Sequence, residues 1–208
     1  GTFRLYRHDA PDASGVRALK INAGTTHDYW LEYRRIVPTR VDQGPRLQNG
    51  VLVHWGRRPP FASGTGTYLL DLTPPADVND APLGLGQTFS DPENAIHVTP
   101  LGVGGDAPRE YIDVKVVLGN AAGNRPPVVT PPAPAAAWVA RTDVPVTTTG
   151  SDPDGDALHW YWNFGDTRVH APAPTTRQRY LRGGTYTATV TASDGRGGAT
   201  SQTLQVNV

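Results

Sequence analysis

The chain has 208 residues, with 19 Lys or Arg, 19 Asp or Glu, and no Cys or Met, so its formal net charge is zero. The lack of Cys excludes a disulfide framework, a thiolate zinc site and a cysteine nucleophile. The charge balance argues against a dedicated nucleic-acid-binding protein, which is normally basic, and no apolar run approaches the ~18 residues that a membrane-spanning helix needs. Because 23 Gly and 20 Pro are spread along the chain, short strands joined by turns are favoured over long helices.

The first half of the chain alternates apolar and polar residues with a period of two, which is typical of half-buried strands. Strands are predicted at residues 3–7, 28–34, 50–55, 68–72, 95–99 and 111–118, with turn-rich segments such as residues 102–106 between them. Tyr29, Leu31 and Tyr33 share one face of their strand, and Glu32 lies on the other. We expect Glu32 to form an exposed ion pair or a hydrogen-bonded support, and residues 1–118 to form an antiparallel β-sandwich.

A Pro-rich linker is predicted at residues 119–126, and Pro-rich linkers are extended and semi-rigid. The strand pattern then restarts at residues 144–148, 158–164 and 185–192 and continues to Val208. Trp160 and Trp162 share a face that is predicted to be buried, whereas His159 and Tyr161 lie on the opposite face. The short strands predict a second, immunoglobulin-like β-sandwich. The expected fold class is therefore all-β, with two sandwiches in tandem.

Residues 124–208 resemble the PKD (polycystic-kidney-disease) family of β-sandwich modules through five motifs in order. The motifs are Asn124-Arg125-Pro126-Pro127-Val128, Gly150-Ser151-Asp152-Pro153-Asp154-Gly155-Asp156, Tyr161-Trp162-Asn163-Phe164-Gly165-Asp166, Gly184-Thr185-Tyr186-Thr187-Ala188-Thr189-Val190 and Ser193-Asp194-Gly195-Arg196-Gly197-Gly198. The sequence departs from the family at Asn163, where Asp is frequent, and at Thr167, where Gly is frequent. The resemblance implies a PKD domain at residues 124–208.

Residues 2–118 resemble the β-domain that follows the catalytic domain in gametolysin-type, immune-inhibitor-A-like secreted zinc metallopeptidases. The motifs that carry this resemblance are Tyr29-Trp30-Leu31-Glu32-Tyr33-Arg34, Gly50-Val51-Leu52-Val53-His54-Trp55, Leu69-Leu70-Asp71-Leu72-Thr73-Pro74, Thr88-Phe89-Ser90-Asp91 and Ile96-His97-Val98-Thr99-Pro100. It implies an extracellular, non-catalytic C-terminal region that stabilises the protease or binds protein or polysaccharide substrate. Its partners would be an upstream catalytic domain of the same chain and that substrate, with no nucleic acid and no membrane span.

The start of the chain agrees with that interpretation, because Gly1 is not an initiator residue and the first predicted strand begins at once. We therefore expect the sequence to be a fragment of a longer precursor. The alternative is a stand-alone carbohydrate-binding or adhesive surface module without protease activity.

No catalytic residues are predicted within the chain. A zincin needs two His spaced i, i+4 on a helix with a neighbouring Glu, and none of the six His has that spacing. No serine nucleophile elbow and no Gly-Lys-Ser/Thr phosphate loop occurs. We expect neither a catalytic zinc nor enzyme activity in this chain, although an enzyme formed by residues 1–118 stays open as a weaker alternative.

Calcium is the one cofactor that the sequence suggests. Asp152, Asp154 and Asp156 alternate in a predicted turn, and carboxylates in a bent loop suit a cation that takes six to eight oxygen ligands. The PKD resemblance implies the ligand set Asn124, Asp152, Asp154 and Asp194. The alternative is that Asp152 and Asp154 only cap a turn through bonds to the backbone. A weaker acidic cluster comprises Asp77, Asn79 and Asp80.

Aromatic side chains offer a candidate ligand surface. His159 and Tyr161 are expected to face outward beside Trp138, and Trp55 precedes the segment Gly56-Arg57-Arg58-Pro59-Pro60, where it is expected at the mouth of a loop. Such side chains could stack on a sugar or contact a protein ligand, and the sequence does not choose between them.

Overall fold

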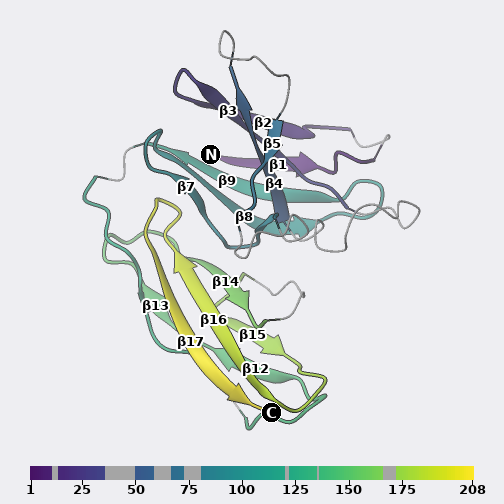
Figure 1. The fold of residues 1–208 in the computed structure, drawn as a ribbon, viewed down its shortest axis with the longest axis vertical. Coiled ribbons are helices and arrows are strands. Elements are labelled where there is room, and N and C mark those ends of the chain that lie inside the picture. The colour runs from purple at the N-terminus through teal and green to yellow at the C-terminus, as the bar shows by residue number, and fades with distance from the viewer. Residues whose placement is uncertain are drawn as a thin grey trace. The chain divides into compact units, whose positions relative to one another are not determined.

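A computed structural model describes residues 1–10, 14–35, 50–58, 67–72, 81–119, 122–134, 136–165 and 172–208 (Figure 1). These residues form strands and turns without a helix, so the all-β prediction is confirmed. The chain divides into two compact units. The first unit comprises residues 1–84 and 89–119, and the second comprises residues 120–208 together with residues 85–88.

The first unit contains two antiparallel sheets. One has the strand order β1-β9-β8-β7, and the other has the order β2-β3-β4-β5 with β6 added to β4. The bounds are β1 Thr2–Tyr6, β2 Ala18–Ala23, β3 His27–Glu32, β4 Gly50–Arg57, β5 Thr67–Leu69, β6 Leu83–Gly84, β7 Phe89–Asp91, β8 Ile96–Gly104 and β9 Tyr111–Leu118.

The two sheets of the first unit pack face to face, as the period-two pattern requires. Tyr29 and Leu31 point inward from β3 and are almost fully buried, as the sequence predicted. The ring centroid of Tyr29 lies 5.1 Å from that of Phe89 on the other sheet, and its hydroxyl donates a 2.9 Å hydrogen bond to Asp91. This edge-to-face contact and the hydrogen bond join β3 to β7 across the sandwich.

Several strand bounds differ from the prediction. Strand β2 was not predicted, although Leu19, Ile21 and Ala23 alternate toward the core in the way that marks a strand. Strand β8 continues through part of the predicted turn at residues 102–106, because a bulge between Pro100 and Gly102 shifts the register and lets pairing with β9 resume.

The second unit contains three small antiparallel sheets. Their strand orders are β14-β16-β17, β11-β12-β15 and β10-β13. The bounds are β10 Val128–Val129, β11 Ala133–Pro134, β12 Val144–Thr147, β13 Gly150–Ser151, β14 His159–Asn163, β15 Thr175–Gln178, β16 Thr185–Ser193 and β17 Ala199–Asn207.

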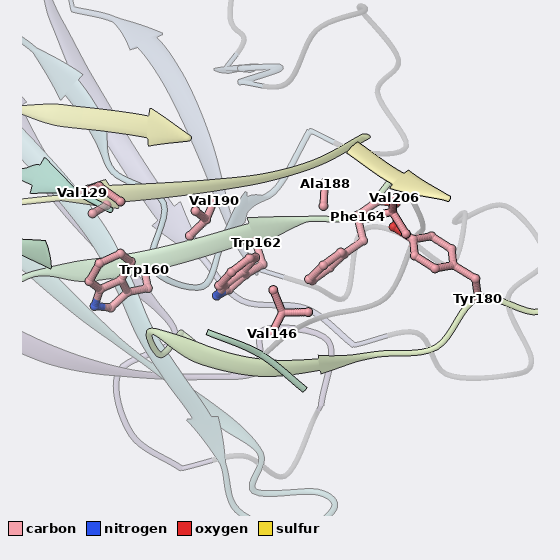
Figure 2. Close-up of a cluster of buried hydrophobic side chains, with 10 residues drawn as sticks. Val129, Val146, Trp160, Trp162, Phe164, Tyr180, Ala188, Val190 and Val206 are labelled. Atoms are coloured by element: carbon pink, nitrogen blue, oxygen red, sulfur yellow. The ribbon is translucent and has the colours of Figure 1, made fainter. Parts of the chain in front are cut away.

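An aromatic core fills the second unit (Figure 2). Trp160, Trp162 and Phe164 come from one face of β14 and its end, and all three are buried, which confirms the predicted core positions. Trp162 stacks on Phe164 with ring centroids 5.3 Å apart, and its indole N–H donates a 2.9 Å hydrogen bond to the Ala173 carbonyl. Because the core takes up the face of β14 that carries Trp160 and Trp162, His159 and Tyr161 lie on the opposite face.

Candidate functional site

The acidic turn after β13 is built by Asp152. Its Oδ1 accepts hydrogen bonds from the backbone N–H of Asp154 at 2.8 Å and of Asp156 at 3.2 Å. The Gly155 N–H bonds to the Asp152 carbonyl, and Gly155 has φ +79°, a conformation that glycine adopts at little cost. The sequence Asp-Pro-Asp-Gly thus gives a side-chain-capped turn.

A second acidic turn joins β16 to β17 and is organised by Asp194, which is fully buried. Its Oδ1 accepts from the backbone N–H groups of Arg196 at 2.6 Å and Gly198 at 3.1 Å. Its Oδ2 accepts a 2.6 Å hydrogen bond from the Asn124 side chain. Three donors compensate the burial of this carboxylate, and the Asn124 bond ties the start of the module to the hairpin.

Position 198 requires glycine because the buried Asp194 carboxylate lies close to it. A Cβ atom at Gly198 would lie 2.1 Å from Asp194 Oδ2 and 3.0 Å from Asn124 Nδ2. No side chain fits there unless the Asp194 carboxylate moves.

Arg125 donates hydrogen bonds to both carboxylate oxygens of Asp154. The Arg125 backbone N–H donates to Asp154 Oδ2 at 2.8 Å, and its Nε and Nη2 donate to Oδ1 at 3.0 and 2.7 Å. These hydrogen bonds lower the pKa of Asp154 below its usual range and raise that of Arg125. Asp156 is likewise paired, 3.0 Å from the Nε of Arg196. The sequence analysis did not single out Arg125, although it directly follows Asn124 in the module's first motif.

The structure therefore brings some of the predicted calcium ligands together. Asn124 contacts Asp194, and Asp152 and Asp154 share one turn, but Asp154 faces a guanidinium. The Oδ2 atom of Asp152 is buried and has no hydrogen-bond partner. This free oxygen could coordinate a cation. The positively charged guanidinium of Arg125, which is bound to Asp154, would repel one. Across the described residues, no three His, Asp or Glu side chains converge to hold a metal ion.

The four residues consequently do not fit calcium in this arrangement, because an ion that used all of them would have to displace Arg125 from Asp154. Calcium binding stays a prediction. The weaker cluster of Asp77, Asn79 and Asp80 lies outside the described residues.

The aromatic residues of the predicted ligand surface lie in separate places. Trp138 is partly buried against the core of the second unit, with its ring centroid 5.6 Å from that of Tyr180. His159 and Tyr161 lie on the opposite face of β14 from the core, half-buried beside β16. These contacts place Trp138 against the core of the second unit, whereas His159 and Tyr161 lie on the other face of β14.

Trp55, the fourth residue of that predicted surface, belongs to the first unit. It lies on β4 with its ring centroid 5.4 Å from that of His27 and 5.9 Å from that of Tyr68. Tyr68 is 66% exposed, so Trp55 is covered on one side by an aromatic ring that itself faces solvent. Residues 59–66, which include the rest of the segment where a loop mouth was expected, lie outside the described residues.

The comparisons with known proteins bear on the second unit. No curated protein matches the chain. A protein-family model described as a PKD domain matches residues 124–208, the same boundaries that the five motifs predicted. PKD domains are non-catalytic modules typical of extracellular proteins. No helix among the described residues is long and apolar enough to cross a membrane. The chain thus carries a PKD domain at residues 124–208.

Proposed function

We propose that the chain is a non-catalytic accessory region of a secreted protein, which holds that protein on an extracellular protein or polysaccharide. The PKD domain at residues 124–208 is the observation that carries this proposal. A module that binds a polymer weakly raises the local concentration of substrate for whatever is linked to it, without new chemistry.

Retention on insoluble polymers tests this function. The chain is incubated with collagen fibrils, chitin, or calcium-free pectin particles, and the protein left in solution is measured after sedimentation. We expect at least one polymer to deplete the chain above a bovine albumin control. If none does, the accessory function is refuted.

We further propose that the protein it serves is a secreted zinc metallopeptidase with its catalytic domain upstream. The support for this is the succession of motifs in residues 2–118 that resembles the post-catalytic β-domain of gametolysin-type enzymes. The full-length open reading frame tests it, since a His-Glu-x-x-His helix encoded before Gly1 is expected. A reading frame without such a motif would favour the alternative, an adhesive surface module without protease activity.

A further inference from the structure

The outer face of the sheet β2-β3-β4-β5 in the first unit carries an exposed indole at its centre. The strand register places Lys20, Trp30, His54 and Leu69 in one row across the four strands. Trp30 is 39% exposed, although it lies on an inner strand with a neighbour on each side. An aromatic ring held open on a rigid sheet is a contact surface that loses little conformational entropy on binding.

Lys20 and Arg58 give one end of this row an excess of positive charge. Lys20 Nζ lies 2.9 Å from Asp28 Oδ2 and 5.3 Å from the centroid of the Trp30 ring. Arg58 also hydrogen-bonds to Asp28, with its Nε at 2.7 Å. Two cations share one carboxylate, so one positive charge beside the indole is left uncompensated within this group. Since the Lys20 side chain is 44% exposed, that charge is accessible.

The charges around His54, the row's third residue, are fixed and balanced. Glu32 accepts hydrogen bonds from Arg34 at 2.8 Å and His54 at 3.0 Å. Burial works to raise the pKa of Glu32, but these two hydrogen bonds outweigh it and hold the pKa at about 2. The carboxylate is therefore a permanent anchor for the His54 ring, which stands next to Trp30.

Gly56 is a buried residue of β4 beside the indole. A Cβ atom there would lie 3.7 Å from Trp30 Nε1 and 3.2 Å from the Thr67 side chain. Because position 56 has no side chain, the indole edge that bears the N–H can lie close to the backbone of β4.

From this arrangement we propose that the Trp30 face, defined as Lys20, Asp28, Trp30 and His54, binds an acidic polysaccharide. The apolar face of one sugar ring stacks on Trp30, and the carboxylate of a uronic acid lies against Lys20. The inference rests on the proposed accessory function and names its ligand class. The excess cation beside Trp30 favours an anionic polymer over a neutral one.

Titration calorimetry of the full chain with oligogalacturonates, in low salt and with chelator present, tests the proposal. We expect Trp30→Ala to weaken binding by about tenfold, which corresponds to the upper range for one aromatic contact, and Trp30→Phe to restore most of it. Lys20→Gln is expected to weaken binding several-fold and to reduce its salt dependence. Phe3→Ala removes an equally exposed aromatic, and Lys115→Gln removes the only other lysine. Both controls should bind as the wild type does.

Several results would overturn the proposal. Absence of oligogalacturonate binding by the wild type, or equal binding by Trp30→Ala, removes the Trp30 face as the site. Equal, salt-independent binding of maltooligosaccharides of matched length refutes the choice of an acidic ligand, and binding of gelatin alone indicates a protein partner instead. If collagen, chitin or pectin still retains the Trp30→Ala variant, the accessory function stands while this site fails. If no polymer binds the wild type, both fail.

Discussion

The charge of Glu32 should stabilise the first unit measurably, and the substitution Glu32→Gln isolates that contribution. The fall in the pKa of Glu32 from its ordinary 4.5 to about 2 corresponds to about 3 kcal/mol, at about 1.4 kcal/mol per pKa unit. Because the folded chain holds this proton less tightly than the unfolded chain, the contribution is fully present above pH 4.5. It is lost as the pH falls toward 2.

Urea unfolding of the wild type and of Glu32→Gln between pH 7 and pH 2 measures the effect, with the unfolding of the first unit followed by fluorescence. For this, Trp138, Trp160 and Trp162 are replaced by Phe in both chains, so that only Trp30 and Trp55 report. At pH 7 the variant should be less stable by about 2–3 kcal/mol, and near pH 2 the two should converge. Glu93→Gln is the matched control, because Glu93 is exposed and its loss should change stability by less than about 0.5 kcal/mol. A variant as stable as the wild type at pH 7, or a difference that persists at pH 2, would refute the reasoning.

Three further outcomes are expected in the second unit. Trp162→Ala should lower its free energy of unfolding by about 3–5 kcal/mol in urea titrations, because a buried indole leaves a cavity; a loss under about 1 kcal/mol would contradict the packing described. Gly198→Ala should cost about 1–3 kcal/mol in the same assay, because the new Cβ would lie 2.1 Å from Asp194 Oδ2; unchanged stability would show that the turn adapts freely. In calorimetry and thermal melts with millimolar calcium, Arg125→Gln should respond more strongly than the wild type, because it frees the Asp154 carboxylate. No heat and no shift in melting temperature in either chain would remove the calcium prediction.

Patterns that repeat along one strand were predictable from the sequence. Alternation alone assigned Trp160 and Trp162 to the core and His159 and Tyr161 to the other face, since successive side chains of a strand point to opposite sides. The same rule would have found β2 through Leu19, Ile21 and Ala23, but the predicted strands did not include it. The match of a PKD family model to residues 124–208 likewise agrees with motifs that are local in sequence.

The sequence did not predict which charged residues pair with each other when they lie far apart in the chain. Arg125 reaches Asp154 across 29 positions, and only the bend of the Asp-Pro-Asp-Gly turn brings them together. Glu32 was expected to form an exposed ion pair or a hydrogen-bonded support; it is buried and hydrogen-bonded, so the second alternative holds. Arg34 from beyond the end of β3 and His54 from the neighbouring strand cover it. The sequence analysis did not propose Trp30 as a ligand residue for a related reason. Its neighbours on the sheet surface come from other strands, and only the pairing register of the four strands places them beside it.

The hydrogen bond between Asn124 and Asp194 also bears on mechanical load. The hairpin of β16 and β17 makes three hydrogen bonds to the start of the domain. Asp194 accepts one from Asn124. The side chains of Thr200 and Gln202 donate to the backbone carbonyls of Pro127 and Val129. Within the six residues from Asn124 to Val129, tension that arrives along the linker therefore meets three bonds to the hairpin, besides the hydrogen bonds from Arg125 to Asp154. The three hairpin bonds attach the leading segment of the PKD domain to its final hairpin, so a pull on the linker is shared with β16 and β17 rather than peeling β10 away first.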